Sequence, residues 1–204
     1  MNLTIYEKDY SCRTKDHFWF QEIKQSILSI VEDGLTLSDI EKESRESNFF
    51  NAASSSRSKE VWQAVNRRLT DVPRNFMDFY VVQNVPDQKL LSLVLIMAED
   101  RTFFEFMNNV IKEKFIVGDT TLKDSEVIGF FHDLQNKDEK ASSWTDASIK
   151  KARSLYKGML KDSGIAKVNS KELILMKPIL SDGIRSFLQE QNLESIMTIL
   201  AGER

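Results

Sequence analysis

Apolar residues recur every three to four positions along most of the chain, the spacing that puts them on one face of a helix. This pattern predicts helices over residues 16–31, 37–47, 55–69, 87–98, 101–116, 122–134, 145–162, 179–191 and 193–201. Residues 101–116 are apolar around nearly their whole girth, so we expect them to form the central core helix. The first 15 residues show no period and are expected to form an N-terminal arm.

One passage, residues 165–178, has the composition of strands instead of helices. Two short β-prone runs flank Asn169 and Ser170, which favours a β-hairpin. Only 7 Gly and 3 Pro occur in 204 residues, so few turns interrupt the helices. The expected fold class is mainly α, a compact multi-helix fold with two helix-turn-helix elements, of which the C-terminal one is winged-helix-like and contains the short β-hairpin.

This fold is expected to divide into three parts. They are the arm (1–15), a helical lobe with the first helix-turn-helix (16–118) and a winged-helix-like lobe (119–204). The polar stretch 135–143 is expected to be a linker within the last lobe.

Composition restricts where such a protein works. The N-terminus carries charges where a signal peptide needs an apolar stretch, and the longest apolar run, residues 90–98, is shorter than the roughly 20 residues that span a bilayer. Cys12 is the only cysteine, so the chain has no internal disulfide, which suits a reducing compartment. We therefore expect a soluble cytoplasmic protein with no membrane contact.

Signals of catalysis are weak in this sequence. His17 and His132 each follow or precede aromatic residues and are interpreted as ordinary surface or core histidines. No glycine-rich phosphate loop, paired-cysteine metal signature or nucleophile elbow occurs. We expect no enzyme activity, no cofactor and no metal. A metal-dependent nuclease is the alternative, because acidic residues are plentiful.

The net charge of −3 conceals a basic segment in the first half of the chain. Residues 16–53 carry eight acids and three cations, whereas residues 54–74 carry five cations and two acids. On a helical wheel the outward side of 55–69 bears groups that bind phosphates and read base edges, namely Ser56, Arg57, Lys59, Gln63, Asn66 and Arg67. The hypothesis is a DNA-reading helix; the alternative is a surface helix with an ordinary charged face.

A second basic segment is denser. Residues 147–177 carry eight cations and only two acids, Asp162 and Glu172. The outward side of the helix 145–162 bears Lys150, Arg153, Ser154, Lys157 and Lys161, and Lys171 lies at the bend of the expected hairpin. A basic second helix followed by a basic hairpin is typical of a winged helix, which places the helix in the major groove of DNA. A solvated lysine face that aids solubility is the alternative.

From residue 35 onward the sequence resembles the BrxA family of bacteriophage-exclusion (BREX) systems. The resemblance rests on three passages in order, 35–69 (LTLSDIEKES…VNRRL), 90–115 (LLSLVLIMAEDRTFFEFMNNVIKEKF) and 158–192 (GMLKDSGIAK…FLQEQN). It implies a monomeric, non-enzymatic binder of double-stranded DNA with two helix-turn-helix elements, acting beside an adenine methyltransferase and other BREX components.

The resemblance also assigns site residues. It places Ser55, Ser56, Arg57, Lys59, Asn66 and Arg67 in the first DNA-binding surface and the outward lysines of 145–162 in the second. The second hypothesis for the same chain is an adaptor that binds proteins within a defence complex and has no DNA binding of its own.

Overall fold

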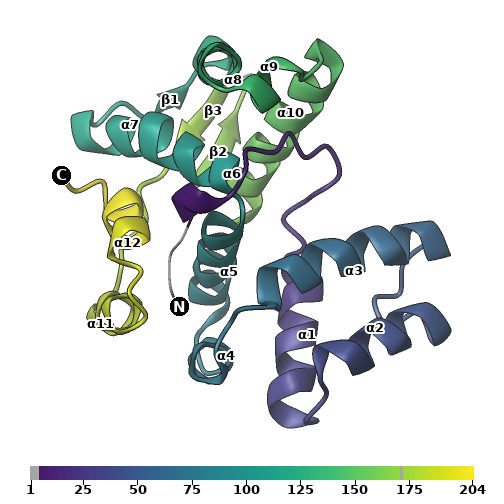
Figure 1. The fold of residues 1–204 in the computed structure, drawn as a ribbon. Helices are drawn as coiled ribbons and strands as arrows, with labels where there is room; N and C mark the ends of the chain where they lie inside the picture. Colours follow the sequence, from purple (N-terminus) through teal and green to yellow (C-terminus); the bar gives the residue numbers. More distant parts are fainter. Residues whose placement is uncertain (1–4, 171) are drawn as a thin grey trace.

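The computed structural model describes residues 5–170 and 172–204, and it is mainly helical (Figure 1). Its helices are η1 (Ile5–Glu7), α1 (Phe20–Glu32), α2 (Leu37–Glu46), α3 (Ser55–Leu69), α4 (Arg74–Val81), α5 (Val85–Glu99), α6 (Arg101–Phe106), η2 (Met107–Ile111), α7 (Lys112–Val117), α8 (Asp124–Lys137), α9 (Glu139–Ser142), α10 (Asp146–Asp162), α11 (Asp182–Glu190) and α12 (Glu194–Ala201). Within those two stretches, no helix is both long and apolar enough to cross a membrane.

Helix α5 and the first part of the run 101–117 lie buried at the centre of the molecule, the place that the sequence predicted for residues 101–116. Residues 90–97 of α5 are all buried. The run from α6 to α7 is continuous and contains one π-helical turn, η2. Its Phe103 and Phe106 pack against Tyr156 of α10 with ring centroids 4.9 and 5.2 Å apart, so the basic helix α10 is anchored on the aromatic core.

A small antiparallel sheet supports one end of the molecule. Strands β2 (Ala166–Asn169) and β3 (Glu172–Leu175) form the predicted hairpin, and β1 (Thr121–Leu122) pairs with β3, giving the order β1-β3-β2. The prediction that residue 122 begins a helix was wrong. Leu122 is a strand residue opposite Leu173, because pairing with a strand fifty residues away overrides the local helical pattern.

Helices α1–α3 form the opposite end, where α2 and α3 run side by side (Figure 1). Thr36 and Ser54 cap the two helices by accepting hydrogen bonds from the amides of Asp39 and Arg57. The buried Ser58 hydroxyl donates to the carbonyl oxygen of Ser44 at 2.8 Å. This bond fixes the position of α3 relative to α2.

Two local predictions were wrong. The first helix begins at Phe20 and not at residue 16, because Trp19 has a left-handed backbone (φ 52°) and the buried guanidinium of Arg68 binds the carbonyl oxygens of His17 and Phe18 at 2.8 and 2.9 Å. The expected linker 135–143 is instead the end of α8 followed by α9. Its Gln, Lys, Glu and Ala residues are good helix formers, so polarity alone did not mark a loop.

The N-terminal arm is held along its whole described length. The Lys8 ammonium donates to the carbonyl oxygen of Ala98 at 3.2 Å, the Tyr10 hydroxyl donates to Glu105 at 2.8 Å, and the amide of Ser11 donates to Thr102 at 2.8 Å. Because α1 begins at Phe20, the arm extends to Trp19 in the structure, and Figure 1 shows it running from η1 across the molecule to the start of α1. Buried apolar side chains from the arm to α12 form one core cluster. The expected division of the chain into two lobes at residue 118 stays a prediction.

Candidate nucleic-acid interface

The exposed side of α3 forms one wall of a groove against α2. This α2–α3 groove has a volume of about 1330 Å³. It brings together nearly all of the residues predicted on α3: Ser55, Ser56, Lys59, Gln63, Asn66 and Arg67. The inward stripe of α3, with Val61, Val65 and Leu69, is buried as predicted. The helix therefore presents hydroxyl, amide and cationic groups on one accessible side.

The opposite wall of this groove is partly acidic. Glu41 and Glu46 of α2 line it together with Arg45, whose guanidinium pairs with Glu41. Within the described ranges, no ion pair involves Lys59. The free positive charge of the groove therefore lies on the α3 wall.

Arg57 does not line the α2–α3 groove. Its guanidinium lies 4.3 Å above the centre of the Trp19 ring and donates to Glu60 at 3.2 Å. Glu60 also accepts a hydrogen bond from Lys15 of the arm at 2.5 Å. Arg57 thus faces the arm and packs α3 against it.

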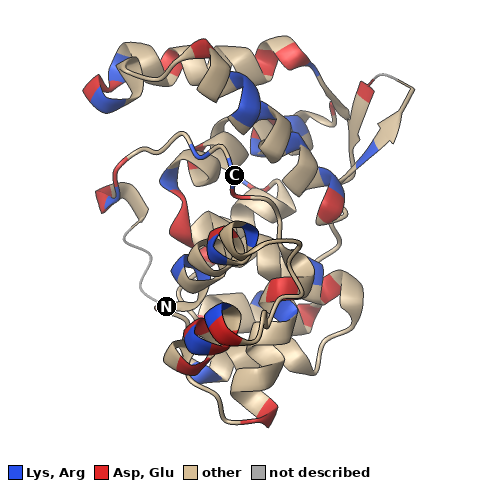
Figure 2. Ribbon diagram, turned by 90° about the vertical axis from the view of Figure 1, so that its right-hand side faces the viewer, with Lys and Arg blue, Asp and Glu red and all other residues tan. Residues whose placement is uncertain are grey.

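Helix α10 presents a second set of cations. Lys150, Lys151 and Lys161 are exposed, and no ion pair within residues 5–170 and 172–204 involves the first two. Helix α10 carries its cations between one acid at either end, Asp146 and Asp162, whereas α2 carries more acids than cations (Figure 2). Lys151 was not among the predicted site residues, although its neighbour Lys150 was. Lys171 lies outside the described residues.

Arg153 and Lys157 turn toward the sheet. Arg153 lies 3.7 Å from the carboxylate of Asp124, the first residue of α8, and Lys157 pairs with the same carboxylate. Lys157 and Asp124 line a groove of about 540 Å³ between α10, β1 and the hairpin, which we call the α10–sheet groove. The predicted outward face of α10 is therefore divided between open solvent and this groove.

The arm passes between the two basic helices. Thr14, His17 and Phe18 line a hollow of about 590 Å³ with Lys150 and Lys151 of α10. His17 and Phe18 also line a neighbouring hollow that reaches Arg57 of α3. Partial burial, and then the charges of Arg57 and Arg68, lower the pKa of His17, so the arm adds a neutral imidazole here at neutral pH. The surfaces of α3 and α10 are thus connected along the arm.

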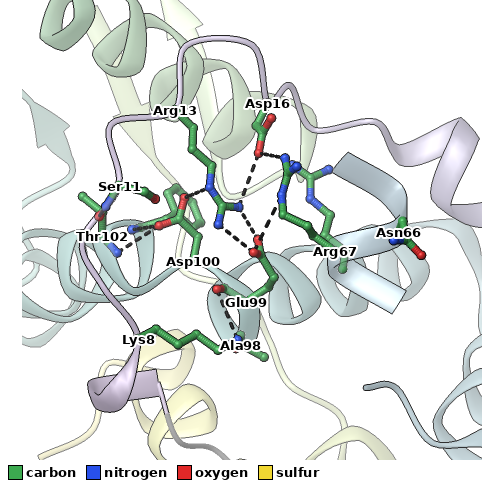
Figure 3. A network of polar contacts seen from close by, with 12 residues as sticks. Lys8, Ser11, Arg13, Asp16, Asn66, Arg67, Ala98, Glu99, Asp100 and Thr102 are labelled. Carbon is green, nitrogen blue, oxygen red and sulfur yellow. Dashed lines mark hydrogen bonds and ion pairs between the residues drawn. The ribbon is translucent and has the colours of Figure 1, made fainter. Parts of the chain in front are cut away.

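Beneath this connection lies a network of charged side chains (Figure 3). Arg13 of the arm donates to Glu99 at 2.6 Å and to Asp16 at 3.3 Å, and its Nε lies 3.9 Å from Asp100. Arg67 of α3 donates to Asp16 at 2.5 Å. The arm, α3 and the junction of α5 and α6 are therefore joined by one set of ion pairs.

The carboxyl group of Asp100 is buried and has an unusual pKa. Burial raises its pKa to about 6 from an ordinary value of 3.8, and the charge of Arg13 only partly offsets this. The same carboxylate caps α6 by accepting hydrogen bonds from the amides of Thr102 and Phe103 at 2.9 and 3.2 Å. The cap and the network thus share one titrating group.

This geometry predicts a pH-dependent effect of Asp100→Asn. Between pH 4 and 6 the Asp100 carboxyl keeps its proton in the folded protein, whereas the same carboxyl in the unfolded chain has released it. The contribution of Asp100 to the free energy of unfolding is therefore fully present below its unfolded pKa and is lost as the pH rises through about 6. Asparagine keeps the capping oxygen and removes the charge. The free energy of unfolding of the variant, relative to the parent, is expected to increase by about 2 kcal/mol from pH 4.5 to pH 7.5 in urea titrations. A difference that stays constant with pH would contradict a raised pKa.

Within residues 5–170 and 172–204, no group of three or more His, Cys, Asp or Glu side chains could hold a metal ion. The accessible sides of α3 and α10 present cations, amides and hydroxyls.

Comparisons with known proteins agree on one family. The BrxA family model matches residues 8–192. A Bacillus cereus (strain H3081.97) protein named BREX protein BrxA is 30% identical over 189 residues, which cover 90% of this chain and 92% of that protein. The crystal structure of an uncharacterized protein from Magnetospirillum magneticum, 15% identical, matches with a TM-score of 0.79 over 96% of this chain and 100% of that one, which shows a shared fold. The chain belongs to the BrxA family.

Proposed function

We propose that this protein binds double-stranded DNA, without catalysing a reaction, through the exposed sides of α3 and α10. The observation that carries the proposal is the accessible row of lysines on α10 beside a hairpin. Helix α7, strand β1, helix α8, the short helix α9, helix α10 and hairpin β2–β3 follow one another, with sheet order β1-β3-β2. That order of elements is typical of winged-helix domains, in which the helix directly before the hairpin, α10 in this chain, would enter the major groove.

The α2–α3 pair supports a second contact. Two helices tied by the bond from Ser58 to Ser44 resemble a helix-turn-helix, in which the second helix reads DNA. The side chains of Gln63 and Asn66 are accessible in the α2–α3 groove and have both donors and acceptors, as reading of base edges requires. Lys59 and the serines at the start of α3 suit phosphate contacts.

The relative's name gives the biological setting of the proposal. Since that protein is a BREX protein, we place this chain in a bacterial BREX phage-defence system, working as a monomer in the cytoplasm. Its partners are then double-stranded DNA and other BREX components. Binding through phosphates at α10 and through base edges at α3 would let one small protein hold DNA and discriminate between sequences.

A salt titration with duplex DNA tests the proposal. With about four phosphate contacts, the affinity is expected to fall by about a hundredfold between about 50 and 200 mM salt, because each contact releases counterions. Fluorescence anisotropy with a labelled duplex measures this, with single-stranded DNA and RNA of the same sequence as comparisons. The absence of duplex binding at the lowest salt, together with co-purification with BREX proteins, would favour the adaptor hypothesis instead. Plasmid cleavage in the presence of Mg²⁺ would favour a nuclease.

A further inference from the structure

The α10–sheet groove contains an acidic side chain among its cations. Lys123, Lys157 and Lys161 line this groove together with Asp124. The Asp124 side chain is 63% exposed, whereas those of Arg153 and Lys157 are 20% and 29% exposed. The carboxylate therefore lies at the surface, beside two cations that are themselves largely buried.

We propose that Asp124 lowers the affinity of α10 for DNA of any sequence, because its carboxylate pairs with cations that would otherwise bind phosphates. We call this effect the electrostatic brake. One carboxylate is shared by Arg153, at 3.7 Å, and by Lys157. Phosphates that approach α10 meet a negative charge at the surface, and this charge offsets half of the combined positive charge of Arg153 and Lys157. Because sequence-independent affinity comes from cation–phosphate contacts, the brake raises the relative weight of base contacts made elsewhere.

The position of Asp124 in the fold supports this role. It is the first residue of α8, where the positive end of the helix dipole favours a carboxylate, and this end of α8 lies beside α10 and the sheet. Like charges placed near an interface discriminate against unwanted partners. A single aspartate thus reduces the effective charge of α10 without changing its lysines.

The test compares Asp124→Asn with Asp133→Asn in duplex binding. Asp133 lies exposed on the same helix α8, and no ion pair in the described stretches involves it, so both variants change the net charge equally. Asp124→Asn is expected to bind random duplex about fivefold more tightly than the parent. Its plot of log affinity against log salt is expected to steepen by about 1. Asp133→Asn is expected to bind like the parent.

A second pair of variants tests whether Asp124 acts through its ion pair with Lys157. In a Lys157→Gln protein the brake has lost one of its two cations, so adding Asp124→Asn is expected to produce a clearly smaller gain than in the parent. Thermal unfolding of each variant checks that the binding measurements compare folded proteins. An undiminished gain would show that Asp124 acts through long-range charge and not through this pair.

The inference rests on the proposed DNA binding, and the outcomes separate the two. If the parent protein does not bind duplex at low salt, the proposed function fails and the inference fails with it. If the parent binds but Asp124→Asn binds no more tightly than Asp133→Asn, the inference alone is overturned.

Discussion

Replacing Arg13 with methionine is expected to lower the free energy of unfolding by about 3 kcal/mol, since it leaves buried carboxylates without their cation. Methionine preserves most of the apolar stem and removes the guanidinium. The side chains of Asp16, Glu99 and Asp100 that surround Arg13 are only 13%, 12% and 5% exposed. Equilibrium urea unfolding at pH 7.5 measures the loss.

The control for Arg13 is Arg45→Met. Arg45 pairs with Glu41 one turn earlier on α2, and its side chain is 73% exposed, so solvent screens the pair and the expected cost is below about 0.5 kcal/mol. Equal losses for the two variants would show that the carboxylates around Arg13 are compensated by water or by Arg67. A large loss for Arg13 alone would establish that the arm is part of the folded core.

The elements that the sequence predicted well are those with complete local signals. Helix α3 has a serine cap, a regular apolar stripe and bounds that match the prediction at both ends. Helix α10 has the same kind of local signals, and Thr145 is its N-terminal cap. The hairpin was identified from β-prone runs on either side of Asn169 and Ser170, and Ser170 does adopt a left-handed backbone (φ 56°). In each case the deciding residues lie within a few positions of one another.

The features that could not be predicted depend on partners distant in the sequence. Strand β1 has only two residues and exists because β3 pairs with it. The arm has no periodic pattern, and its path is set by contacts with residues about ninety positions away, such as that of Ser11 with Thr102. Nothing in the sequence near Arg13 indicates Glu99 as its partner. Such pairs become visible only when the chain is folded.

The exposure of the candidate DNA-binding residues could be predicted only in outline, for a related reason. A helical wheel gives the direction of each side chain from its own helix axis, and it correctly placed Lys59, Gln63 and Lys150 at the surface. It gives no information on what lies beside that helix. Arg57 and Arg153 point outward from their helices but meet the arm and α8, respectively.

Reversing the charge of Lys150, Lys151 and Lys161 is expected to produce the largest loss of function. Glutamate at these three exposed positions would remove three of the proposed phosphate contacts and add repulsion, so duplex affinity is expected to fall by about a hundredfold or more. The salt dependence of log affinity is expected to become shallower by about three. The same loss is expected for every duplex sequence, because lysine contacts to phosphates carry no sequence information.

The matched control reverses three lysines on other elements. Lys24 on α1, Lys112 on α7 and Lys137 on α8 form no ion pair within the described ranges, and changing them to glutamate alters the net charge by the same amount. Near-parental binding by this control, with a large loss for the α10 variant, would locate the contact on α10 and exclude a general effect of charge. Equal losses for the two variants would mean that the affinity for DNA depends only on the overall charge of the protein. An unchanged affinity of the α10 variant would leave α3 as the DNA-binding helix. Because the three results assign the contact to different parts of the molecule, this comparison decides between the two surfaces that the fold presents.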